Sequence, residues 1–220
     1  MANVRSGSHG YYYGSFYNES EPLSQEEMYI NAVYIKNYLT ARGWSINAIA
    51  GMLGNIHAES TINPGRWQSE DVNNTSMGFG LVQWTPATKY IEWCSEQGLS
   101  DPSEMDNNLA RILYELKNNI QWIATSSYNF TFEEFSTSNL SVSELAKAFL
   151  LNYERPADQS EEVQNYRSVL AEGYYEAISG NAPTPEYPTQ TNPVKKKFNF
   201  ILFNSRKRRN LWIKQNSIIK

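Results

Sequence analysis

The chain has 220 residues, a formal charge of −4, an apolar share of 40% and a single cysteine. This length suits one domain with appendages, and one cysteine excludes a disulfide framework and a zinc site built on cysteines. No run approaches the roughly 20 apolar residues of a membrane-spanning helix, and the first residues lack the pattern of a signal peptide. We therefore expect no transmembrane segment and no conventional export signal.

The charge is divided unevenly along the chain. Residues 195–220 carry nine Lys or Arg and no acidic residue, so residues 1–194 hold ten basic and 23 acidic residues, a formal charge of −13. A basic tail behind an acidic body is typical of a segment that contacts something anionic. Teichoic acid, nucleic acid, a membrane face and an acidic neighbour in an assembly all fit this description.

Residues 1–22 are rich in Gly, Ser, Tyr and Asn without an apolar period, which predicts a disordered arm. Ser24 begins a capping box with Glu27, and apolar residues at helical spacing then predict a helix that ends before Gly43. A second helix is predicted to begin at Ser45 and to continue to Glu59. Its apolar residues recur at helical spacing, which indicates a buried, central helix.

The rest of the body is also predicted to be helical, apart from an irregular loop or short hairpin at 66–82. Helices are expected from Thr85 to Gly98, from about 105 to 123 with the longest apolar stripe, from 141 to 153 and from Ser160 onward. We expect a lysozyme-like domain over residues 23–179, a Pro/Thr-rich linker at 180–194 and the basic tail at 195–220. The predicted fold class is mainly α, a bundle around a central helix with one small irregular lobe.

Three short motifs stand in a specific order. They are G-N-x-x-x-E-S at 54–60, G-x-G-x-x-Q-W at 78–84 and Y-E-R-P at 153–156. Together they resemble the phage tail lysozyme family, the cell-wall-degrading domain of bacteriophage tail tips, and more distantly goose-type lysozymes and lytic transglycosylases. The resemblance covers about residues 28–178.

Glu59 is the candidate catalytic acid. It lies at the negative end of a helix dipole beside apolar residues, and both surroundings favour a protonated carboxyl group. Cleaving a glycosidic bond requires a proton for the leaving oxygen, and the resemblance assigns this role to the Glu of the first motif. His57, two residues earlier on the helix, points away from it and is interpreted as structural.

Other residues are candidates for the remaining roles. Glu70 and Asp71, in the irregular lobe, are the candidates for a second catalytic carboxylate. The candidate substrate-binding residues are Ser60, Gly80, Gln83, Trp84 and Tyr153. The resemblance places the Gln of the second motif in the sugar groove and a tyrosine near the catalytic Glu, whereas the neighbouring Glu154 and Arg155 are expected to form an ion pair at a helix end.

The sequence therefore predicts a muramidase that cleaves the β-1,4 bond between N-acetylmuramic acid and N-acetylglucosamine in bacterial peptidoglycan. No metal or cofactor is expected, and the expected setting is a phage virion in contact with other tail proteins. Two alternatives are left open. One is a lytic transglycosylase that leaves 1,6-anhydro ends, and the other is a non-catalytic module for wall binding or virion assembly.

Overall fold

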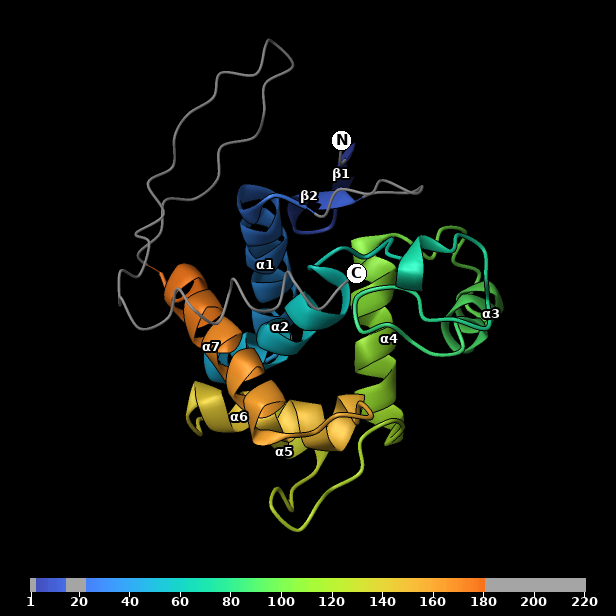
Figure 1. Cartoon of the computed structure of the whole chain (residues 1–220). Helices are drawn as coiled ribbons and strands as arrows, with labels where there is room; N and C mark the ends of the chain where they lie inside the picture. The colour runs from blue at the N-terminus through green and yellow to red at the C-terminus, as the bar shows by residue number, and fades with distance from the viewer. Residues whose placement is uncertain (1–2, 15–22, 181–220) are drawn as a thin grey trace. The chain divides into compact units, whose positions relative to one another are not determined.

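A computed structural model describes residues 3–14 and 23–180, which form seven α-helices, two short strands and two shorter helical turns (Figure 1). In chain order the elements are β1 (Asn3–Gly7), β2 (Gly10–Gly14), α1 (Gln25–Thr40), α2 (Ile46–Ser60), η1 (Gln68–Glu70), α3 (Thr88–Glu96), α4 (Met105–Asn118), α5 (Phe132–Thr137), α6 (Val142–Phe149), η2 (Leu150–Glu154) and α7 (Glu161–Ile178). The prediction of a mainly helical fold is confirmed.

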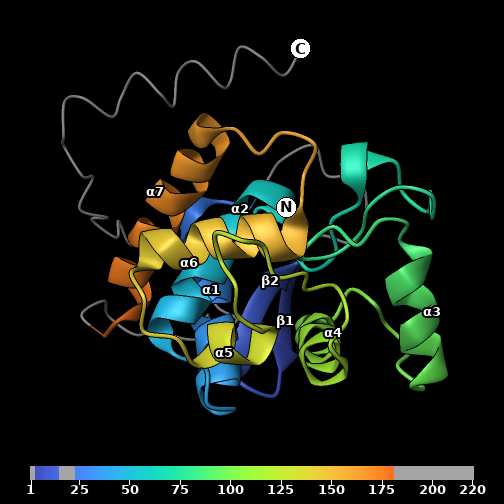
Figure 2. The same cartoon turned by 90° about the horizontal axis from the view of Figure 1, so that it is seen from below.

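Helix α2 is the centre of the bundle, with α7, α6 and α1 packed around it (Figures 1 and 2). Its residues from Ala48 to Ile56 are all buried, which agrees with the apolar period of the sequence. Two glycines allow the neighbouring helices to approach closely. A Cβ on Gly51 would lie 2.9 Å from the backbone of α6, and one on Gly54 would lie 2.7 Å from Ala171 of α7.

The predicted helix starts are correct at four places, one of which is Ser160, whose hydroxyl accepts from the amide of Val163. Ser24 and Ser141 form capping boxes with the Glu three residues later, and the Ser45 hydroxyl accepts from the amide of Ala48. The predicted start at Thr85 is wrong. Helix α3 begins at Thr88, because the Thr85 hydroxyl donates to the Gln83 carbonyl instead of capping a helix.

The long helix predicted at 105–123 is shorter than its apolar stripe. Asn119 adopts a left-handed conformation (φ 58°) and ends α4, so Ile120 and Ile123 lie beyond the helix and are 40% and 59% exposed. Helix α5 was not predicted, although Thr131 and Glu134 form the same kind of capping box that marks α1 and α6. Helix α6 widens into the π-helical turn η2 before residue 155, which a helical period does not reveal.

The disordered arm predicted at residues 1–22 is a wrong prediction for residues 3–14, which form an antiparallel hairpin. Tyr12 is fully buried and donates to the Glu104 carboxylate, and Arg5 forms an ion pair with Asp101 at 2.7 Å. The hairpin is thus attached by polar contacts and by the buried rings of Tyr11 and Tyr12, which an apolar period does not detect.

The lobe at 66–87 is irregular, as expected. It contains the turn η1 and two isolated bridges, Trp67 with Phe79 and Phe79 with Trp84. The predicted basic tail and nearly all of the predicted linker lie outside the described residues. Within the part of the chain that the structure describes, no helix is both long and apolar enough to span a bilayer.

Candidate functional site

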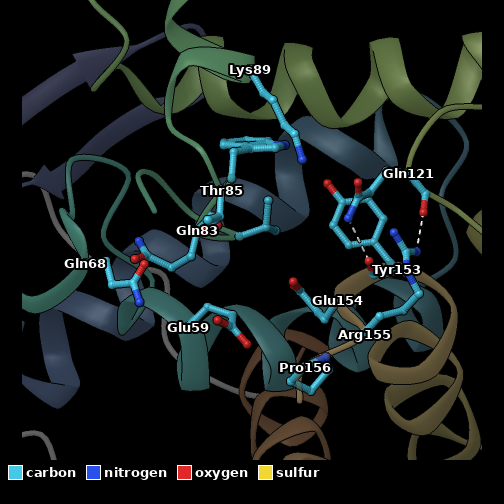
Figure 3. Close-up of a pocket in the computed structure, with 12 residues that line it drawn as sticks. Glu59, Gln68, Gln83, Thr85, Lys89, Gln121, Tyr153, Glu154, Arg155 and Pro156 are labelled. Atoms are coloured by element: carbon cyan, nitrogen blue, oxygen red, sulfur yellow. Dashed lines mark hydrogen bonds between the residues drawn. The ribbon is translucent and has the colours of Figure 1, made fainter. Parts of the chain in front are cut away.

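A cleft of about 430 Å³ lies where the irregular lobe faces the end of α2 and the turn η2 (Figure 3). Its lining is largely polar and comes from α2, the lobe, the start of α3, the 119–130 segment and η2. The lining residues are Glu59, Gln68, Val82, Gln83, Trp84, Thr85, Lys89, Gln121, Tyr153, Glu154, Arg155 and Pro156. In Figure 3, Gln68, Gln83 and Thr85 lie on one side and Gln121, Tyr153 and Arg155 on the other, with Glu59 and Glu154 between them.

Glu59 enters the cleft because α2 ends there. Thr61 follows in a left-handed conformation (φ 55°), and its amide donates to the His57 carbonyl to close the helix. The expected apolar neighbours are not the whole of its surroundings, since Arg167 Nη2 lies 2.6 Å from Glu59 Oε1. The side chain of Glu59 is 21% exposed and that of Arg167 8% exposed, so the ion pair is largely shielded from water.

The first motif explains how Arg167 reaches Glu59. Gly54 lets α7 approach α2, and Arg167 Nη1 then donates to the carbonyl and side-chain oxygens of Asn55, each at 3.3 Å. The side-chain nitrogen Nδ2 of Asn55 donates to the carbonyls of Gly51 and Ala146, and these two bonds fix the orientation of the Asn55 side chain. A buried charge requires a partner and hydrogen bonds. The G-N pair therefore orients the arginine, and the arginine orients the catalytic candidate.

Glu154 is a second carboxyl group in the same cleft, and the sequence analysis did not identify it as such. It is the last residue of the π-helical turn η2, an element that occurs frequently at functional sites. Its Oε1 is fully buried, and no residue in the described ranges hydrogen-bonds it. The predicted ion pair with Arg155 is wrong, because the Arg155 guanidinium donates to the backbone carbonyls of Gln121 and Asn152.

The surroundings of Glu154 favour its protonated form. Burial raises the pKa of Glu154 well above its ordinary range, and the negative charges of Glu59 and, more weakly, Glu115 raise it further. Arg167 and Arg155 act in the opposite direction without cancelling this rise. The cleft therefore contains one carboxyl group bound to an arginine and one carboxyl group that holds its proton.

A third carboxyl group, Glu115 of α4, lies behind the cleft wall and is 1% exposed. It accepts from Trp84 Nε1 at 2.9 Å, from Arg111 Nε at 2.9 Å and from the Tyr153 hydroxyl at 2.5 Å. Burial raises the pKa of Glu115, and these three donors oppose the rise. Because Trp84 belongs to the lobe and Tyr153 to η2, this one carboxyl group joins the two walls of the cleft.

Three of the expected substrate-binding residues, Gln83, Trp84 and Tyr153, line the cleft. Gln83, at φ 50°, donates through Nε2 to the carbonyls of Arg66 and Gly80, so its amide shapes the lobe and also faces the cleft. Trp84 stacks on Tyr90 with ring centroids 4.3 Å apart and still lines the cleft. Gly80 is a turn residue at φ 84°, where a Cβ would meet Asn108 Oδ1 at 2.7 Å.

Several other expectations are corrected. The hydroxyl of Ser60 is buried and donates to the Ile56 carbonyl, so it does not line the cleft. Tyr153 lines the cleft, but its hydroxyl binds Glu115 and not Glu59. Asp71 is exposed, accepts from Asn74 Nδ2 and is absent from the cleft lining. Glu70 is the last residue of η1, and the expectation about its side chain stays a prediction.

His57 is structural, as expected, since its Nδ1 lies 2.7 Å from the Tyr174 hydroxyl. Burial lowers the pKa of His57 to about 4, so the ring is neutral at pH 7. In the described residues no group of three or more His, Cys, Asp or Glu side chains could hold a metal ion.

The sequence does not single out three residues that line the cleft, Glu154, Lys89 and Gln121, or Arg167, which pairs with Glu59. Glu154 belonged to a quoted motif and was assigned a structural role because its neighbour was a plausible partner. Val163, Tyr166 and Leu170 recur at helical spacing and predict the inward face of this helix. The buried residues of α7 instead include Arg167, Ser168 and Ala171. A single charged residue within a predicted core face was the available signal.

Comparison with known proteins adds an independent finding. Residues 30–178 match the family model of the phage tail lysozyme, a range that includes every residue of the cleft. Morphogenesis protein 1 of Bacillus phage B103 is 52% identical over 169 residues, which cover 77% of this chain and 45% of that protein. The chain thus spans less than half the length of this relative.

Proposed function

The chain belongs to the phage tail lysozyme family, and on this premise we propose that it is a glycosidase that cleaves the glycan strand of bacterial peptidoglycan. The proposed bond is the β-1,4 link between N-acetylmuramic acid and N-acetylglucosamine. The observation that carries the proposal is Glu59, which the first motif delivers to the wall of a polar cleft. A carboxyl group at that place is what glycosidic cleavage requires.

The cleft offers contacts suited to an amide-bearing sugar. Gln68 and Gln83 supply amide groups on one wall and Gln121 on the other, and amides both donate to and accept from an acetamido group. Trp84 supplies an aromatic surface, which can pack against the apolar face of a hexose. In this proposal Glu59 acts as the general acid that protonates the leaving oxygen.

The proposed setting is a phage particle that penetrates the bacterial wall. The relative from phage B103 bears the name of a morphogenesis protein, which suits a component of the virion. Contacts with other tail proteins, and a contact of residues 195–220 with an anionic polymer, belong to the same proposal.

The test is digestion of purified peptidoglycan with mass spectrometry of the soluble fragments. We expect the wild-type protein to release fragments with reducing ends, and Glu59→Gln to lower the rate by at least about 100-fold. Glu96→Gln, an exposed residue of α3, is the matched control and should cut at the wild-type rate. Release of 1,6-anhydro ends would identify a lytic transglycosylase, and wall binding without cutting would identify a non-catalytic module.

A further inference from the structure

The cleft contains a second carboxyl group, Glu154, to which a single general acid at Glu59 assigns no role. Within the described part of the chain, the buried side-chain nitrogen and oxygen atoms without a hydrogen-bond partner are Trp93 Nε1, Glu154 Oε1 and Arg167 Nε. Two of these three atoms belong to the group formed by Glu59, Glu154 and Arg167. Buried polar atoms are nearly always satisfied, so unsatisfied ones indicate a site that is completed by something else.

Each charged group around Glu154 comes from a different element. Glu59 ends α2, Glu115 lies on α4, Arg167 lies on α7 and Arg155 caps η2. Arg167 forms an ion pair with Glu59 at 2.6 Å, and the Glu115 carboxylate accepts hydrogen bonds from three donors of its own. Glu154 lines the same cleft as the ion-paired Glu59, and Figure 3 draws both side chains between the two walls of the cleft.

We propose that Glu154 is the second catalytic carboxyl group of this cleft, and that it shares with Glu59 the one proton that glycosidic cleavage consumes and returns. This inference rests on the proposed function and extends it. When two carboxyl groups interact, the protons belong to the pair and not to either residue alone. The two members of the pair differ in their partners, because Glu154 Oε1 is buried without a donor while Glu59 Oε1 faces a guanidinium group.

The balance of the reaction follows from this arrangement. The pair gives one proton to the leaving oxygen as the bond between that oxygen and the anomeric carbon breaks. A water molecule adds its oxygen to the anomeric carbon, and its released proton returns to the pair. No oxidant, metal or further reactant is consumed, and the pair ends the cycle with one proton, as it began.

The inference is an alternative to the lobe carboxylate Asp71. Asp71 is exposed outside the cleft, whereas Glu154 lines it beside Glu59. It also favours hydrolysis over transglycosylation, because a second carboxyl group in the cleft can accept a proton from the attacking water.

The experiment measures kcat and KM for peptidoglycan cleavage against pH with the full-length protein. We expect Glu154→Gln to lower kcat by at least about 100-fold while KM changes by less than about threefold. In the plot of the residual kcat against pH, the decrease on the alkaline side should move to lower pH, because the carboxyl group of Glu154, whose protonated form burial favours, has been removed. The double variant Glu59→Gln/Glu154→Gln should be no slower than Glu59→Gln, because residues that act as a unit are not additive.

Two further variants keep the test decisive. Glu154→Asp retains a protonable group and should recover part of the lost rate. It also provides the test if Glu154→Gln fails to fold. Glu172→Gln, an exposed residue of α7, should behave as wild type. If Glu154→Gln cuts within about threefold of wild type with an unchanged alkaline limb, the inference is overturned and the proposed function stands. If wild type cuts nothing, the proposed function fails and the inference fails with it.

Discussion

Two carboxyl groups belong to the same part of the cleft, Glu115 behind its wall and Glu154 in its lining, and they differ in what surrounds them. Glu115 accepts from an indole, a guanidinium and a phenol, whereas Glu154 Oε1 accepts from no described residue. Burial is the first cause of a raised pKa in both. Burial alone therefore does not separate a structural carboxyl group from a chemical one.

The difference lies in whether donors are present. A carboxylate that accepts three hydrogen bonds is fixed in place and its negative charge is stabilised, so Glu115 serves to join the lobe to η2. A carboxyl group without donors keeps its proton and its capacity to bind a ligand. Glu115 thus stabilises the fold of the cleft, and Glu154 is the residue to which we assign a catalytic role.

The largest expected effect is on the scaffold. Glu115→Ala removes the shared acceptor of Trp84, Arg111 and Tyr153, and we expect the free energy of unfolding to fall by about 3–5 kcal/mol, because a buried arginine loses its partner. Urea unfolding followed by tryptophan fluorescence measures this change. The exposed control Glu96→Gln should alter stability by less than about 0.5 kcal/mol. If the free energy of unfolding of Glu115→Ala fell by less than about 1 kcal/mol, Glu115 would not have the structural role that separates it from Glu154.

A smaller loss of stability is expected when Arg167, the ion-pair partner of Glu59, is replaced. Arg167→Met leaves Glu59 without its ion-pair partner and removes the bonds to Asn55, so stability should fall by about 2 kcal/mol. We also expect kcat to fall by about 100-fold with little change in KM, because Arg167 positions Glu59 without contacting the sugar. Arg167→Lys keeps the charge and should recover part of kcat. Wild-type kcat in Arg167→Met would refute the positioning role.

The smallest effect is on the pH dependence of stability. The pKa of Glu154 is raised in the folded state above the ordinary value of 4.5, so the native protein binds more protons than the unfolded chain between the two values. Stability is then fully present below pH 4.5 and decreases as pH rises through the raised pKa. Glu154→Gln should flatten this decrease and leave the part that comes from Glu115. Thermal unfolding from pH 4 to pH 9 measures the slope, and an identical slope in both proteins would mean that Glu154 does not retain its proton.

The helices of this fold could be predicted from the sequence because they depend on local signals. Ser24, Ser45 and Ser141 mark helix starts through bonds to residues only three positions away. The hairpin at residues 3–14 could not be predicted, since it is held by bonds to residues such as Asp101 and Glu104, more than 90 positions away. The apolar stripe past Asn118 misled in the opposite direction, because a left-handed residue ended the helix.

The site divides in the same way. Glu59, Gln83 and Tyr153 could be selected from motifs, and all three line the cleft. The ion pair between Arg167 and Glu59 joins residues 108 positions apart, and the unsatisfied oxygen of Glu154 is a property of its three-dimensional surroundings. No local pattern contains either fact, which is why the sequence placed the second carboxyl group in the lobe.

The most direct test of the account is the crystal structure of Glu59→Gln bound to a peptidoglycan tetrasaccharide. The account predicts that the glycosidic oxygen of one link lies within about 3.2 Å of the residue 59 side chain, which is hydrogen-bond reach, with the Glu154 carboxyl group in contact with the same sugar. A glycan that binds elsewhere on the protein, or that crosses the cleft without approaching Glu154, would contradict it.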